Sequence, residues 1–93
     1  MGKQLRILVV DDERHIREVL EIGLSDEGYD VRSAPDGQIG LQIVREWSPD
    51  IVVLDVMLPK IDGVKLLPML RQLTEAPIVM LRYAPHARRD SRW

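Results

Sequence analysis

The segments LRILVV (residues 5–10) and IVVL (residues 51–54) decide the fold, because each is a short aliphatic run that ends in acidic residues. Asp11 and Asp12 follow the first run, and Asp55 follows the second. Runs of Val, Ile and Leu between helical segments are typical of buried strands in a parallel sheet. Ligands of such sheets bind at the carboxyl ends of the strands. If these two strands are neighbours, their three carboxylates form one site that favours a hard cation.

Helical patterns lie between the predicted strands. Asp12 is the expected N-cap of the first helix, and Gly28 is its expected end. Asp36-Gly37 predicts a turn before a second helix that ends near Trp47. The other expected elements are strands at about residues 5–10, 30–34, 50–55 and 78–81 and helices at about residues 13–27 and 64–73.

This βαβαβαβ order predicts an α/β fold, because its short connections favour right-handed crossovers and therefore a doubly wound parallel sheet. A chain of 93 residues is long enough for only one small domain, which we expect over residues 1–81. A chain of this size buries only roughly 60–65% of its unfolded surface. Residues 82–93 (RYAPHARRDSRW) show neither helical nor strand periodicity, which indicates a separate basic tail.

The composition is that of a globular domain, with 45% hydrophobic and 30% charged residues. Residues 1–81 carry 9 Lys and Arg against 14 Asp and Glu, whereas residues 82–93 carry 4 Arg against 1 Asp. The acidic body disfavours nonspecific nucleic-acid binding, and no apolar run approaches the roughly 18 residues of a membrane span. The absence of cysteine excludes disulfides and fits a cytoplasmic location.

Four motifs point to a known family: ILVVDDE at residues 7–13, DG at 36–37, PDIVVLDVMLPKIDG at 49–63 and APIVML at 76–81. Together they resemble the receiver domain of two-component response regulators over about residues 4–81. LDVMLPKIDG is most similar to receivers that precede a winged-helix DNA-binding domain. The resemblance implies a flavodoxin-like sheet with strand order 2-1-3-4-5, of which this chain supplies the 2-1-3-4 part.

The resemblance also implies a role for each acidic residue. Asp55 would be the phosphate-accepting nucleophile, and Asp12 would bind Mg²⁺ directly. Asp11 would bind the ion through water, and the backbone carbonyl of Met57 would add a ligand. The chemistry agrees, because Mg²⁺ and Mn²⁺ prefer oxygen ligands and an ionised Asp can attack a phosphoryl group in line.

The sequence departs from the family pattern after residue 81. Arg82 stands where the family has a Thr or Ser that hydrogen-bonds the phosphoryl oxygen. The last strand, with its phosphate-pairing Lys, and the last two helices have no counterpart. We therefore expect a C-terminally truncated receiver with impaired phosphotransfer, since losing one electrostatic donor costs about 10²–10³ in rate. The strand at 78–81 becomes an unprotected edge, which predicts a homodimer or larger assembly through edge pairing or segment exchange.

Two functions of different classes follow. The first is a receiver module of two-component phosphorelay signalling, not itself an enzyme, that takes phosphate from a sensor histidine kinase or phosphotransfer protein onto Asp55. The second is a non-catalytic receiver fragment that self-associates and has a structural or interaction role. Metal binding without signalling is a third possibility that uses the same acidic residues. Neither nucleic acid nor membrane is an expected partner of this chain itself.

Overall fold

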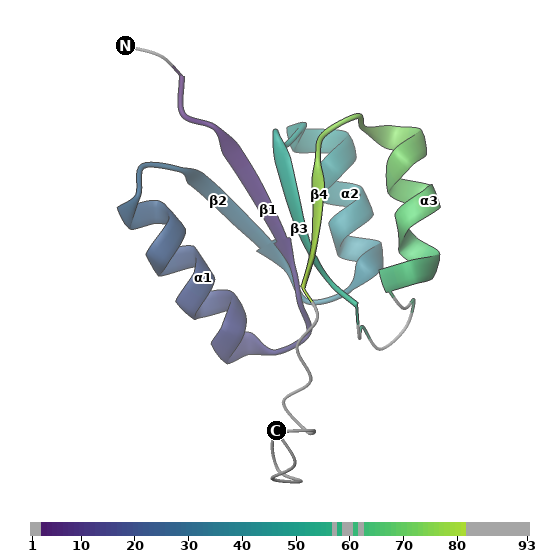
Figure 1. The fold of residues 1–93 in the computed structure, drawn as a ribbon, viewed down its shortest axis with the longest axis horizontal. Coiled ribbons are helices and arrows are strands. Elements are labelled where there is room, and N and C mark those ends of the chain that lie inside the picture. Colours follow the sequence, from purple (N-terminus) through teal and green to yellow (C-terminus); the bar gives the residue numbers. More distant parts are fainter. Residues whose placement is uncertain (1–2, 57, 59–60, 62, 82–93) are drawn as a thin grey trace, which may run out of the picture.

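A computed structural model describes residues 3–56, 58, 61 and 63–81 of the 93-residue chain. Helices and strands alternate in the predicted βαβαβαβ order (Figure 1). The expectations for Met57, for Arg82 and for the tail lie outside the described residues. The elements are β1 (Arg6–Val10), α1 (Arg14–Asp26), β2 (Asp30–Ala34), α2 (Gly37–Trp47), β3 (Ile51–Asp55), α3 (Gly63–Leu73) and β4 (Ile78–Leu81).

The four strands form one parallel sheet in the order β2-β1-β3-β4, which confirms the predicted doubly wound architecture. β1 and β3 are neighbours at its centre, and their register pairs Val10 with Leu54. Asp11 follows Val10 and Asp55 follows Leu54, so the two acids come next in the same register. The central strand pair therefore positions the acidic site.

The helices cover the two faces of the sheet unequally: α1 lies on one face, and α2 and α3 lie on the other (Figure 1). Alternate residues of each strand point to the same face of the sheet. Those that point toward α2 and α3 form the core. Leu8 and Val10 of β1 are fully buried there, as are Val52 and Leu54 of β3 and Leu66 and Leu70 of α3.

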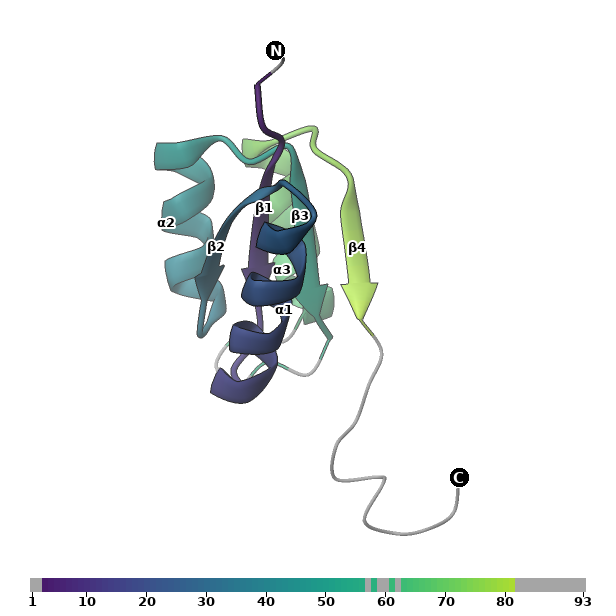
Figure 2. The same cartoon turned by 90° about the vertical axis from the view of Figure 1, so that its left-hand side faces the viewer.

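The face that carries α1 is less well covered. Within α1 no residue is buried, and Val19 and Ile22 are 52% and 64% exposed. Val79 of β4 is 49% exposed, and Figure 2 shows that α1 does not extend over β4. Apolar surface is therefore left on α1 and on the β4 side of the sheet.

The amino ends of the strands are held by contacts with Trp47, the last residue of α2. The guanidinium carbons of Arg6 and Arg32 lie 5.5 and 4.7 Å from the centre of its ring, within range of a cation–π interaction. Arg6 also donates to the carbonyl of Trp47. These contacts tie β1 and β2 to α2 at the edge of the sheet opposite the acidic residues.

The helix starts differ from the prediction at one point. Asp12 was expected to cap α1, but the N-cap is Glu13, which makes no capping hydrogen bond through its side chain. Instead, Oδ1 of Asp11 accepts a hydrogen bond from the Glu13 amide at 2.9 Å, which turns the chain before the helix begins. In α2, Asp36 is the N-cap, and its Oδ1 accepts from the Ile39 amide at 3.0 Å.

Candidate functional site

Three carboxylates meet at the carboxyl end of the sheet. Asp11, Asp12 and Asp55 each offer an oxygen atom, and these atoms all lie within 4.8 Å of one another. The first two residues follow β1 and the third ends β3, so the adjacency of these strands brings them together. The structure thus confirms the predicted juxtaposition of the three acids.

The site has a buried floor and one exposed member. Asp11 is fully buried and Asp55 is 2% exposed, whereas Asp12 is exposed to solvent. The amide of Asp11 donates to the carbonyl of Ala34 at 3.0 Å, which holds this residue against the end of β2. A cation can therefore approach from the Asp12 side and meet two carboxylates that the fold already fixes.

Gly63, the first residue of α3, presses against the backbone behind Asp55. Its amide donates to the carbonyl of Val56 at 3.0 Å. A Cβ atom added at Gly63 would lie 2.6 Å from the carbonyl oxygen of Asp55 and 2.8 Å from Cα of Val56. No side chain fits at those distances, so glycine lets α3 begin directly against the end of β3. In the sequence, Gly63 is distinguished only as the last residue of the motif at 49–63.

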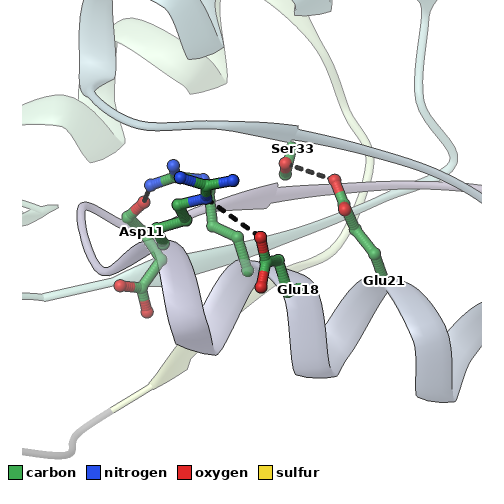
Figure 3. Close-up of polar contacts among 6 residues, drawn as sticks. Asp11, Glu18, Glu21 and Ser33 are labelled. Carbon is green, nitrogen blue, oxygen red and sulfur yellow. Dashed lines mark hydrogen bonds and ion pairs between the residues drawn. The ribbon is translucent and has the colours of Figure 1, made fainter.

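Arg17 of α1 contacts the backbone of one of the three acids. Its Nη1 donates to the backbone carbonyl of Asp11 at 2.8 Å, and the residue is half-buried. Figure 3 shows this contact beside two others on α1, the Arg14–Glu18 ion pair and the hydrogen bond from Ser33 to Glu21. Sequence reasoning missed Arg17, because the helical pattern does not distinguish it from the surface charges around it.

The electrostatics of the three acids favour a cation. Two full negative charges 4.8 Å apart repel by roughly 3–4 kcal/mol at an effective dielectric constant of about 20. The repulsion is weaker for the exposed Asp12, where solvent screens the charge. Carboxylate oxygens are the ligands that Mg²⁺ and Mn²⁺ prefer, and the exposed side leaves space for the waters that Mg²⁺ retains. The donor set therefore fits a hard divalent cation.

The sequence matches that of a known domain family. The response regulator receiver domain pattern matches residues 7–88. A probable transcriptional regulator, ycf27, of Porphyridium aerugineum is 50% identical over 76 residues, which are 82% of this chain and 32% of that protein. The ycf27 protein of Galdieria sulphuraria is 47% identical over 81 residues, which are 87% of this chain and 32% of that protein. The chain thus spans about a third of the length of these relatives.

Solved structures show the same arrangement of strands and helices. The N-terminal domain of a response regulator receiver protein from Methanoculleus marisnigri gives a TM-score of 0.82 at 29% identity, covering 95% of this chain and 76% of that one. A putative response regulator from Chloroflexus aurantiacus gives 0.79 at 42% identity, covering 84% and 66%. Within the described parts of this chain, no helix has the length and apolar character needed to cross a membrane.

Replacing Gly63 with Ala should distort the site, because the added methyl group meets backbone atoms of Asp55 and Val56 that cannot move aside. We expect the free energy of unfolding in urea to fall by about 1–3 kcal/mol. Gly23→Ala is the matched control, since no atom lies within 4 Å of its added Cβ. In the middle of α1 that change should stabilise the protein by about 0.5–1 kcal/mol. Equal stability of the two variants would contradict the close contact at Gly63.

Proposed function

The chain belongs to the response regulator receiver family, and from this premise we propose that it is a phosphoacceptor module of two-component signalling with Asp55 as the acceptor. The observation that carries the proposal is the position of the Asp55 carboxylate. It ends the central strand β3, and its oxygen lies within 4.8 Å of carboxylate oxygens from Asp11 and Asp12. An acidic group in this position can serve both as a cation ligand and as a nucleophile.

Asp11, Asp12 and Asp55 would hold Mg²⁺, with Mn²⁺ as the alternative ion, and the carbonyl of Met57 would add a ligand by analogy with the family. When bound, the ion would neutralise phosphoryl oxygen charge that otherwise repels the nucleophile. The buried pair supplies ligands that the strands fix, and the exposed Asp12 supplies a ligand on the solvent side.

In the proposed reaction, a carboxylate oxygen of Asp55 bonds to phosphorus while the phosphorus–nitrogen bond of a donor phosphohistidine breaks. The leaving imidazole takes up a proton. The chain's own contribution is to hold the nucleophile still, because β3 and Gly63 enclose the backbone of Asp55. The donor would be a sensor histidine kinase or a phosphotransfer protein, in the cytoplasm.

We expect the transfer to be slower than in the family at large. By resemblance, Arg82 occupies the place of the hydroxyl residue that hydrogen-bonds the phosphoryl oxygen. A guanidinium is larger than a hydroxyl and presents a planar set of donors, so it replaces that contact poorly. Any transcriptional output belongs to the longer relatives, of which this chain spans about a third.

A second candidate function is self-association without phosphotransfer, and the exposed apolar residues favour it. Val19 and Ile22 belong to α1. Val79 pairs with Val53, which alternates with the core residues Val52 and Leu54 and so lies on the face that carries α1. In the described structure β4 is an edge strand that pairs only with β3. Exposed apolar edge strands are templates for pairing with another chain. We therefore propose a homodimer in which β4 contributes to the interface.

The phosphoacceptor assignment is tested by intact mass after incubation with Mg²⁺ and acetyl phosphate. We expect the mass increment of one phosphoryl group on the unmodified chain and none on Asp55→Asn, because the amide cannot act as the nucleophile. Asp26→Asn, an exposed acid at the far end of α1, is the control and should be modified like the parent chain. An increment retained in Asp55→Asn would remove Asp55 from this role.

The metal assignment is tested by thermal unfolding with and without MgCl₂. A ligand that binds only the folded state stabilises it by about 2.7 kcal/mol at a concentration of about 100 times Kd. We expect the melting temperature to rise with Mg²⁺ and the rise to be much smaller in Asp12→Ala. Asp26→Ala should respond like the parent chain. An unchanged response in Asp12→Ala would show that the ion binds elsewhere.

Self-association is tested by sedimentation velocity at tens of micromolar. We expect a dimer that Val79→Asp converts to monomer, because the substitution places a charge in the proposed apolar contact. Val64→Asp is the matched control, since Val64 is also exposed but belongs to α3 on the opposite face. A parent chain that sediments as a monomer, or a Val79→Asp variant that remains dimeric, would reject this interface.

A further inference from the structure

We propose that Arg17 is a built-in counter-charge of the acidic site, one that stabilises the metal-free protein and weakens its affinity for a divalent cation. Nη1 of Arg17 lies 2.8 Å from the backbone carbonyl of Asp11. The carboxylate of that same residue lies within 4.8 Å of those of Asp12 and Asp55. The inference rests on the proposed cation site, and it adds a residue that acts on that site through its charge.

The position of Arg17 in α1 is unfavourable for the helix alone. It lies in the first two turns, and the N-terminal end of a helix carries a partial positive charge that disfavours cations. The first turn of α1 contains no acidic residue that would offset this effect. Glu13, the N-cap of α1, lies four residues before Arg17, and the carboxylates of the acidic site lie beyond it at the ends of β1 and β3. The positive charge of Arg17 is therefore favoured by acidic residues around the helix start and not by the helix itself.

The planar guanidinium group of arginine carries a positive charge. Without metal, this positive charge reduces the repulsion among the three carboxylates and so favours the folded state. When a divalent cation enters, the same charge opposes it. In a partly solvated site, we expect the second effect to change Kd roughly tenfold.

The competing interpretation is that Arg17 only holds the backbone of Asp11 in place through its hydrogen bond. The two interpretations predict opposite signs. If the hydrogen bond alone matters, removing Arg17 loosens the site, and both stability and Mg²⁺ affinity fall. If the charge matters, removing it lowers the stability of the metal-free protein but raises Mg²⁺ affinity.

The test is calorimetric titration of the full chain with MgCl₂, together with urea unfolding of the metal-free protein. Arg17→Gln removes the charge and keeps an N–H donor, and we expect its Kd for Mg²⁺ to fall roughly tenfold while its unfolding midpoint also falls. Arg17→Lys keeps the charge, and its Kd should stay near that of the parent chain. Arg14→Gln is the matched control, because Arg14 is exposed and pairs with Glu18.

Ionic strength provides a second readout that a purely structural role does not change. The difference in Kd between the parent chain and Arg17→Gln should shrink as KCl is raised, because salt screens charge interactions. If the parent chain binds Mg²⁺ and Arg17→Gln binds it equally well or more weakly, the counter-charge is rejected while the cation site stands. If no variant binds Mg²⁺ at all, the proposed cation site fails, and the inference fails with it.

Discussion

The site depends on the parallel pairing of β1 with β3. The register that joins Val10 to Leu54 makes Asp11 and Asp55 neighbours, and these two carboxylates are then buried close together. Their mutual repulsion opposes folding, and packing within the core helps to offset it. Leu8, Val52 and the rest of the core on the α2 and α3 side supply that stabilisation. The fold thus uses a well-packed face to hold an unfavourable cluster of charges at its edge, as functional sites commonly do.

Much of this arrangement could be predicted from sequence. The aliphatic runs predicted the strands to within one residue of their observed bounds. The acids at the ends of those runs predicted the group of three carboxylates. The prediction that Asp12 caps the helix was wrong. The side chain of Asp11 accepts a hydrogen bond from the Glu13 amide, which turns the chain, and Glu13 is the N-cap. In sequence, the neighbouring acids Asp11 and Asp12 are equally plausible partners for that turn.

The roles of Gly63 and Arg17 could not have been predicted, because both depend on contacts between distant segments. Residues 62–63 have the same Asp-Gly sequence as residues 36–37. Only the tertiary structure shows that a Cβ atom at Gly63 would meet the backbone of Asp55. Arg17 is one of several charges on α1, and only its hydrogen bond to Asp11 sets it apart. Family similarity supports the fold and the receiver assignment, and the geometry adds these two residues.

The unequal exposure of the acids has a kinetic consequence. Asp12 is exposed to solvent, whereas Asp11 and Asp55 are buried. An ion bound by these three carboxylates would therefore keep one side in contact with bulk water. Such an ion would exchange readily with the surrounding solution. At the proposed cation site, binding would therefore be a reversible step whose extent follows the concentration of the ion around the protein.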